Sequence, residues 1–261
     1  MSQVEPIFRR VVADGTWEPS ALARGPFAGL QGGAVAGLLA GEIEARADAS
    51  GWGQAVSAAA WFLRPIPMNR LRTQVVPLRV GGRVSVVDNT LWVEGEDEPC
   101  ATVRVTLMQS RPVEVAGFVG PAETVVDPSL LGLSARPARH GDPWFMDAME
   151  ARAGGGVSWF RMKAPVMAGA GPLAQALGPA DWAHGVSRPV WDVVADPNPN
   201  LTVHLARPPR GDWLGLQPTT HWTPELSRGA GAGLLSDTRG VVGSVSMAVA
   251  LTAFRPARVE A

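Results

Sequence analysis

Residues 27–45 read FAGLQGGAVAGLLAGEIEA, a helical pattern crowded with glycine. Apolar side chains recur there at the spacing of one helix face, at Val35, Leu38, Leu39 and Ile43. The sequence therefore predicts a helix over residues 31–47 with a Gly32-Gly33 pair at its start. Because glycine costs about 1 kcal/mol relative to alanine inside a helix, we expect another backbone or a ligand to come very close to this segment.

The rest of the chain repeats one pattern twice. A short apolar segment runs into Arg-Pro at Arg64-Pro65 and again at Arg207-Pro208, which places the two copies 143 positions apart (207 − 64). A strand and then a Gly/Ala-rich helix precede each Arg-Pro. In the first copy they are expected at residues 7–17 and 31–47, and in the second copy at residues 156–162 and 172–185. Three strand-like segments follow each Arg-Pro. They are residues 71–80, 84–93 and 101–108 in the first copy, and residues 213–222, 230–235 and 241–251 in the second. A period this long indicates a duplicated domain rather than a solenoid repeat.

Each copy predicts an α+β unit in which an antiparallel, curved sheet wraps around a central helix. Small residues alternate along the last strand, at Ser244, Ser246, Ala248 and Ala250. We expect the glycine-bearing helix to sink toward such a face, with Gly32 or Gly33 in backbone contact with the sheet. The two curved sheets would join edge to edge, because this pairing covers exposed strand edges.

The segment between the two copies has a different character. Residues 113–153 lack a clear strand pattern and are interrupted by proline, so we interpret them as a connector with a short helix near residues 144–151. The expected organisation is an N-terminal unit over residues 1–112, a connector over residues 113–153 and a C-terminal unit over residues 154–261.

Composition excludes several classes of protein. The 261 residues carry a formal net charge of −1 and no run of Lys or Arg, which argues against nucleic acid or an anionic membrane as the main partner. No apolar signal core opens the chain and no segment offers 18 uninterrupted apolar residues, so we expect a soluble, cytoplasmic protein. Cys100 is the single cysteine, which excludes a disulfide framework and a cysteine-based metal site.

Familiar catalytic motifs are missing as well. His140, His184, His204 and His221 share no metal-ligand spacing. There is no G-x-S-x-G nucleophile elbow, no G-x-G-x-x-G after a strand and no Walker lysine. These absences argue against a metal, a serine nucleophile and a bound nucleotide, and we expect no cofactor.

Several segments together resemble one known family. LQGGAVAGLLA (residues 30–40), FLRPIP (62–67) and GRVSVVDNTLWVEGEDEPCATVRVTL (82–107) in the first copy are similar to segments of the double-hotdog acyl-CoA thioesterases, the thioesterase II-like family. In the second copy, GPADWAHG, NPNLTVHLARPPRGDWLGL and SDTRGVVGSVSMAVAL extend the resemblance over nearly the whole chain. The resemblance implies a tandem hotdog fold, an acyl-CoA substrate, a place in lipid metabolism and hydrolysis by water without a metal.

The family holds its hydrolytic water with an Asp, a Thr and a Gln of the second unit. Matched by motif, the Asp position is Asp181, the Thr position is Asn198 and the Gln position is Ser246. Asn198 can still hydrogen-bond a water, whereas the Ser246 side chain reaches less far than glutamine. A structural interpretation stays open for each residue: Asp181 as a helix cap, Asn198 as a turn residue and Ser246 as a small packing residue.

Four further residues are candidates for substrate binding. Gly32 and Gly33 open the first helix, where unpaired N–H groups could meet a thioester oxygen or a phosphate, although close packing would equally explain them. Arg64 and Arg207 could bind the phosphates of coenzyme A, or be solvated charges at strand ends. Asp181 and His184 lie one helical turn apart, a spacing that also arises by chance.

Three functions remain open on this basis. The first is an acyl-CoA thioesterase in which Asp181, with Asn198 and Ser246, positions the attacking water. The second is a protein that binds acyl-CoA or another apolar ligand without hydrolysing it. The third, a hotdog hydratase or dehydratase, has less support because no Asp/His pair matches the spacing those enzymes show. Self-association into a homo-oligomer is left open.

Overall fold

The glycine-rich stretch forms helix α1 (Gly32–Ala47), and the corresponding stretch of the second copy forms α2 (Pro172–Ala180). The structure is a computed structural model, and it describes residues 5–120, 123–134, 143–188 and 194–253. In the first copy the strands are β1 (Phe8–Arg10), β2 (Trp17–Pro19), β3 (Gln54–Phe62), β4 (Leu71–Arg79), β5 (Val84–Val93) and β6 (Pro99–Met108). The later strands are β7 (Gly132–Leu133), β8 (Met149–Gly154), β9 (Val157–Met162), β10 (Val194–Ala195), β11 (Asn200–Leu205), β12 (Trp213–Pro218), β13 (His221–Thr223), β14 (Arg228–Asp237), β15 (Gly240–Ala250) and β16 (Thr252–Ala253).

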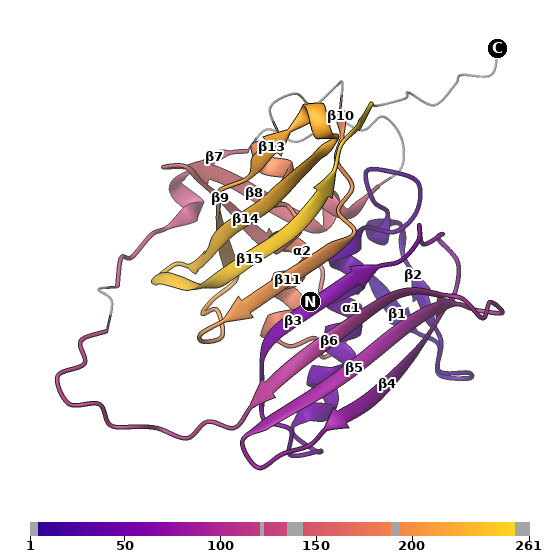
Figure 1. The fold of residues 1–261 in the computed structure, drawn as a ribbon, viewed down its shortest axis with the longest axis horizontal. Coiled ribbons are helices and arrows are strands. Elements are labelled where there is room, and N and C mark those ends of the chain that lie inside the picture. The colour runs from indigo at the N-terminus through magenta and orange to yellow at the C-terminus, as the bar shows by residue number, and fades with distance from the viewer. Residues whose placement is uncertain (1–4, 121–122, 135–142, 189–193, 254–261) are drawn as a thin grey trace.

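Fourteen of these strands form one continuous antiparallel sheet. Its order is β1-β2-β4-β5-β6-β3-β11-β15-β14-β12-β9-β8-β7, with β13 paired to β14 (Figure 1). The expected edge-to-edge joining is present: β3 and β11 pair over residues 57–61 and 200–204, so the two curved sheets of the expectation form one continuous sheet. This pairing satisfies backbone groups that two separate sheets would leave exposed at their edges.

The two halves repeat the same order of strands. In the first half, β2, β4, β5, β6 and β3 follow one another across the sheet, and in the second half β9, β12, β14, β15 and β11 do the same. Within each of these sets, the strand that precedes the helix, β2 or β9, lies at the outer end, and β3 or β11, which follows the helix, lies at the centre of the sheet. The duplicated pattern of the sequence is therefore present in the topology.

Several boundaries differ from the sequence-based expectation. Residues 7–17 form the β1–β2 hairpin rather than one strand, because Gly15 adopts a φ of +73° in the turn between them. Residues 213–222 are divided between β12 and β13. Within the expected connector, a short 3-10 helix (Phe145–Ala148) leads into β8, whose Ala- and Gly-rich sequence hides its alternation.

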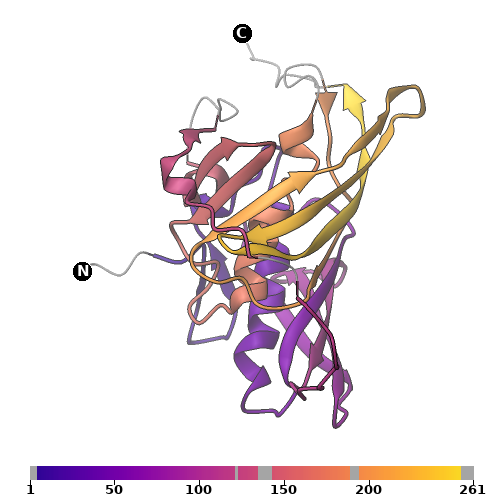
Figure 2. The ribbon, with the colours of Figure 1, turned by 90° about the vertical axis from the view of Figure 1, so that its left-hand side faces the viewer.

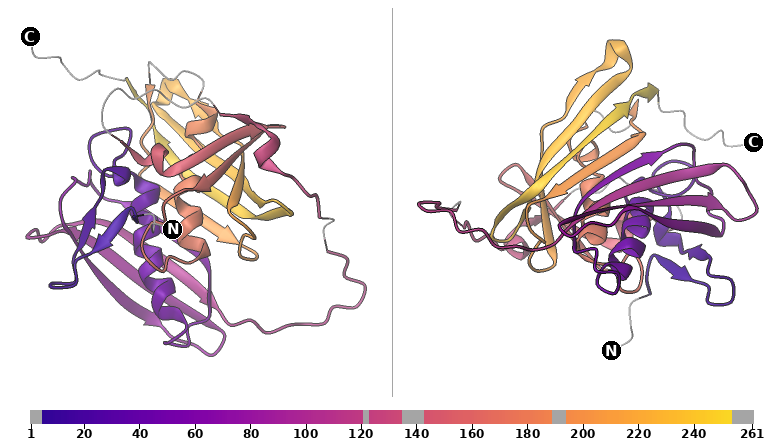
Figure 3. Two further views of the ribbon diagram at one scale, coloured as in Figure 1. Left: turned by 180° about the vertical axis from the view of Figure 1, so that it is seen from behind. Right: turned by 60° about the horizontal axis from the view of Figure 1, so that its bottom comes forward.

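Both helices lie together on one face of the sheet, as Figures 2 and 3 show. On β15 the side chains directed to this buried face are Val245, Met247 and Val249, whereas Ser246, Ala248 and Ala250 are exposed. The expectation that the small residues receive the helix is therefore wrong. Burial of apolar area favours the larger side chains on the helix-facing side.

The glycines of α1 face α2, not the sheet. A Cβ placed on Gly33 would lie 2.6 Å from Cβ of Asp181 and 2.7 Å from the carbonyl oxygen of Leu177. One turn further, a Cβ on Gly37 would lie 2.8 Å from the carbonyl oxygen of Ala174. Gly32 instead lies against the ring of Phe62 on β3. The expected close approach is confirmed, but its main partner is the backbone of the second helix.

Candidate active site

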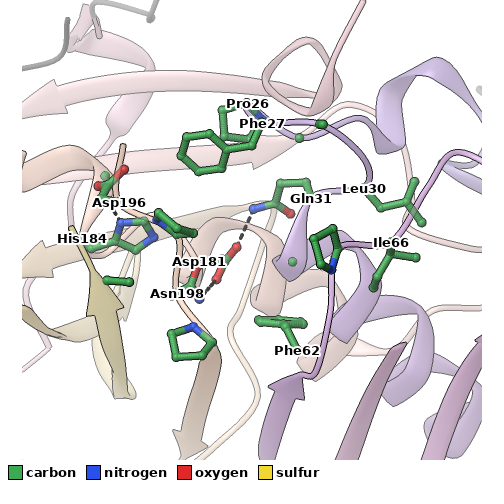
Figure 4. Close-up of a pocket in the computed structure, with 18 of the residues that line it drawn as sticks. Pro26, Phe27, Leu30, Gln31, Phe62, Ile66, Asp181, His184, Asp196 and Asn198 are labelled. Atoms are coloured by element: carbon green, nitrogen blue, oxygen red, sulfur yellow. Dashed lines mark hydrogen bonds and ion pairs between the residues drawn. The ribbon is translucent and has the colours of Figure 1, made fainter. Parts of the chain in front are cut away.

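A pocket of about 400 Å³ opens where the start of α1 meets the end of α2 (Figure 4). Its lining comes from the segment before α1, the end of β3, the residues after α2 and the segment before β11. Apolar side chains make up much of the wall, at Phe27, Leu30, Phe62, Ile66 and Trp182. The helix–helix contact therefore places residues of both halves around one cavity.

Asp181 is the central polar residue of this pocket. It is the C-cap of α2, in keeping with the helix-cap interpretation, and it is 5% exposed. Its carboxylate reaches the first turn of α1, where Oδ2 accepts hydrogen bonds from Nε2 of Gln31 at 2.6 Å and from the N–H of Gly33 at 2.9 Å. Its Oδ1 accepts from Nδ2 of Asn198 at 2.7 Å. Asp181 thus caps the helix start of α1 and faces the pocket at once.

The surroundings of Asp181 favour its action as a base. Burial raises the pKa of this carboxyl group above its usual value, although His184, when protonated, and the three hydrogen bonds oppose the shift. A carboxylate has about four lone-pair positions, and three of them are occupied. The remaining position on Oδ1 can accept a proton from a water molecule, and a raised pKa brings the base closer to neutral pH.

The two glycines of the helix start have different roles. The N–H of Gly33 is engaged with Asp181, so it is not available to a substrate. The N–H of Gly32 meets no acceptor within the described residues, and Gly32 lines the pocket. It also stands at the N-terminus of a 16-residue helix, where the aligned peptide dipoles favour negative charge. Gly32 can therefore donate to an oxyanion that forms in the pocket.

The structure brings Asp181 and Asn198 together but leaves Ser246 outside. Ser246 is an exposed residue of β15, on the face turned away from the helices. The amide that completes the polar cluster belongs to Gln31, which sequence analysis missed. Gln31 is the N-cap of α1, and its Oε1 accepts from the N–H of Ala34 at 2.6 Å. Its polar side chain directly before the Gly-Gly pair was a local signal, but nothing local links it to a residue 150 positions away.

The two arginines of the repeated Arg-Pro motif are both paired. Arg64 lines the pocket, forms an ion pair with Glu96 at 2.5 Å and donates to the carbonyl oxygen of Glu98 at 2.9 Å. Arg207 is not in the pocket lining and pairs with the carboxylate of Asp237. Burial alone would raise the pKa of Asp237, but hydrogen bonds, first that from Arg207, lower it to about 2. Of the two, Arg64 alone stands where a ligand of this pocket could reach it.

A second buried polar cluster forms the wall beside Asp181. Nδ1 of His184 lies 2.8 Å from Oδ2 of Asp196, and Arg188 pairs with the other oxygen of the same carboxylate. Asp196 is fully buried and His184 is 8% exposed. Burial lowers the pKa of His184 to about 4, a shift that Arg188 reinforces and the charge of Asp181 opposes. His184 is therefore neutral at neutral pH.

Among the described residues, which do not include His140, there is no group of three His, Cys, Asp or Glu side chains that could hold a metal ion. Within the same residues, no helix has the length and apolar character needed to span a bilayer.

Comparison with known proteins identifies relatives of this arrangement. Residues 23–108 match the family model of the acyl-CoA thioesterase N-terminal domain, and no curated protein sequence matches the chain. A candidate thioesterase II from Thermobifida fusca is 17% identical with a TM-score of 0.71, over 97% of this chain and 99% of its own. A protein with a hotdog fold from Alicyclobacillus acidocaldarius is 17% identical with a TM-score of 0.67, and the match covers 94% of this chain and 95% of that protein. The acyl-CoA thioesterase II TesB2 of Mycobacterium marinum is 14% identical with a TM-score of 0.62, and the match covers 95% of this chain and 97% of that protein.

At these identities the structural matches show the fold alone, whereas the family model concerns the sequence. The model covers the segment before α1, α1 itself and strands β3 to β6, the half that supplies Gln31, Gly32 and Gly33 to the pocket. The resemblance to the acyl-CoA thioesterases with a hotdog fold is therefore confirmed, by the family model over residues 23–108 and by the fold over nearly the whole chain.

Proposed function

We propose that this protein is an acyl-CoA thioesterase built as a tandem, or double, hotdog, which hydrolyses fatty acyl-CoA to the free acid and coenzyme A. The observation that carries the proposal is the placement of the buried Asp181 carboxylate beside the N–H of Gly32, which meets no acceptor among the described residues; both groups lie in the wall of an apolar pocket. A base and an oxyanion donor are the two groups that thioester hydrolysis requires.

The reaction would proceed through a tetrahedral intermediate. Oδ1 of Asp181 removes a proton from a water molecule as the water oxygen attacks the thioester carbonyl carbon. The carbonyl oxygen becomes an oxyanion, which the N–H of Gly32 and the dipole of α1 stabilise. The C–S bond then breaks, its electron pair leaves on sulfur, and the proton held by Asp181 passes to the thiolate. No metal or cofactor takes part in this sequence.

The remaining side chains suggest how the substrate lies. The apolar wall formed by Phe27, Leu30, Phe62 and Ile66 suits an acyl chain. Arg64 at the same pocket is the candidate partner for a phosphate of coenzyme A, provided that it exchanges Glu96 for the ligand. Arg207 has no comparable access to this pocket and is not part of the proposed substrate site.

The division of the chain belongs to the same proposal. The N-terminal hotdog would comprise residues 1–112, the connector residues 113–153 and the C-terminal hotdog residues 154–261, with β8 as a strand contributed by the end of the connector. With this substrate, the proposal also places the protein in lipid metabolism, and we propose that it acts in the cytoplasm.

One observation favours a second candidate function, a protein that binds acyl-CoA without hydrolysing it. The Asp181 carboxylate already accepts three hydrogen bonds from the protein, and these lower its basicity. In this alternative the carboxylate would act as the cap of α1, and the apolar pocket would hold the acyl chain without turnover.

An acyl-CoA panel of increasing chain length separates the two candidates. Release of free thiol from the purified protein, with binding followed in parallel by calorimetry, is the measurement. We expect thiol release that saturates with substrate and depends on chain length. Binding without thiol release at every chain length would favour the binding protein, and the absence of both would contradict either function.

Gln31 offers a test of the hydrogen bonds around the proposed base. In the Gln31→Leu variant, Asp181 loses a donor that favours its charged form, so the pKa of Asp181 rises further. We expect the acid limb of kcat/KM to move to higher pH. The stability should fall by about 1–3 kcal/mol, because buried partners lose their hydrogen bonds.

The matched control is Gln109→Leu, which removes a partly exposed glutamine outside the pocket that donates to the carbonyl oxygen of Gly51. It should leave the pH profile unchanged. If the acid limb of Gln31→Leu coincided with that of the wild type, Asp181 would not be the group that sets it.

A further inference from the structure

The cluster of His184, Asp196 and Arg188 has no role in the mechanism described so far. A fully buried carboxylate is costly unless it is paired and hydrogen-bonded, and here both partners come from the residues that follow α2. All three side chains line the same pocket as Asp181. Figure 4 shows Asp196 on one side of the His184 ring, whose other edge is turned toward Asp181 and Asn198.

The pairing determines which nitrogen of His184 carries the proton. Because burial keeps the imidazole neutral, one ring nitrogen is protonated and the other is a bare acceptor. Nδ1 lies 2.8 Å from the Asp196 carboxylate, which can only accept, so the proton resides on Nδ1. Nε2 therefore carries its lone pair on the side of the pocket, where the His184 ring also meets the side chain of Asn198. Arg188 neutralises the charge of Asp196 and so disfavours a protonated imidazole.

We propose that Nε2 of His184 is a second acceptor for the nucleophilic water, with Asp196 and Arg188 as the positioning residues that hold the ring in this tautomer. The inference rests on the proposed function and deepens it. A water molecule has two protons and the attack requires one defined orientation of its oxygen lone pair. With Oδ1 of Asp181 and Nε2 of His184 as acceptors, both protons are held and the lone pair is directed at the carbonyl carbon.

Both protons of the attacking water are then accounted for. The first proton of the water goes to Asp181 and from there to the leaving sulfur, which gives the thiol. The second proton stays on the new carboxylic acid until the C–S bond has broken. Nε2 of His184 accepts it as the acid ionises, and the imidazolium, disfavoured by burial, returns it to solvent. One water and one thioester give one carboxylate, one thiol and one released proton.

Two substitutions of the same residue separate a catalytic role from a structural one. His184→Asn keeps an amide near the position of Nδ1, where it can bond Asp196, and leaves the position of Nε2 empty. His184→Gln extends an amide oxygen to the position of Nε2. We expect His184→Asn to lower kcat by on the order of 10²-fold with little change in KM, and His184→Gln to regain part of that loss. His204→Gln, on an exposed residue of β11, is the control.

The tautomer itself is measurable without turnover. The chain has four histidines, so ¹⁵N labelling of histidine gives a spectrum that the His184 and His204 variants help to assign. At neutral pH we expect the His184 ring to be protonated at Nδ1 and unprotonated at Nε2. In Asp196→Asn the amide can donate to Nδ1, so this preference should weaken and kcat should fall, while KM changes little.

The outcomes distinguish this inference from the proposed function. Full activity of His184→Asn together with an inactive Asp181→Asn variant would overturn the role of His184 and leave the thioesterase in place. A wild-type His184 ring protonated at Nε2 would do the same. Absence of thiol release from every acyl-CoA in the wild type would overturn the proposed function and this inference with it.

Discussion

Asp181→Asn is expected to lower kcat for acyl-CoA hydrolysis by on the order of 10²–10⁴-fold, the usual cost of removing a general base. Asparagine has the shape of aspartate, and its oxygen can accept the hydrogen bonds of Gln31 and Gly33. Its amide nitrogen then faces Asn198, whose side-chain amide must rotate to present an oxygen. The fold and the binding of acyl-CoA should therefore survive, whereas the proton acceptor is lost. Thiol release and the Kd for acyl-CoA are the measurements.

The same variant should be at least as stable as the wild type at neutral pH. Burial raises the pKa of Asp181 in the folded state above its unfolded value. A group of this kind contributes stability that is fully present below its unfolded pKa and is lost as pH rises through the folded pKa. At neutral pH the ionised Asp181 therefore lowers the stability, and asparagine does not. The Tm difference between variant and wild type should increase as pH rises from 4 to 7.

A surface carboxylate provides the control for Asp181. Asp88→Asn removes a carboxylate of β5 that pairs with Arg104 at 2.7 Å and lies outside the pocket lining. This control should hydrolyse acyl-CoA at the wild-type rate. Wild-type turnover by Asp181→Asn would remove Asp181 from the mechanism. A Tm for Asp181→Asn well below the wild-type value would show instead that the charge stabilises α1.

Gly33→Leu is expected to destabilise the protein by about 1–3 kcal/mol or more, the usual range for overpacking. Even the first carbon of a side chain would lie 2.6 Å from Cβ of Asp181 and 2.7 Å from the carbonyl oxygen of Leu177. These atoms belong to α2 or its cap and can move only if the two helices separate. Because the N–H of Gly33 also holds Asp181 in place, hydrolysis should fall as well. Thermal unfolding and thiol release together test this prediction.

Gly132→Leu is the matched control, since a Cβ at that position of β7 meets nothing within 4 Å. Its Tm should remain close to that of the wild type. An unchanged Tm for Gly33→Leu would contradict the close approach of the two helices, which is the contact that forms the pocket.

Local patterns determined much of this architecture. The apolar spacing over residues 31–47 predicted α1, and the alternation over residues 84–93 predicted β5 with the bounds that the structure shows. The repeated Arg-Pro pattern predicted a duplication that appears in the order of the strands. Each of these features depends on residues near one another in the chain, whose periodicity is a direct consequence of helix or strand geometry.

Which elements meet at the site and at the junction of the two halves was decided by tertiary structure alone. Asp181 and Gln31 meet across 150 positions because glycines on α1 let α2 approach, and a single sequence does not state which elements touch. Edge-to-edge joining of the halves was expected, but the choice of β3 and β11 as the paired strands leaves no periodic signal. Ser246 lies outside the site because apolar burial turns Val245 and Met247 inward. Sequence periodicity describes the faces of an element, and packing decides what each face meets.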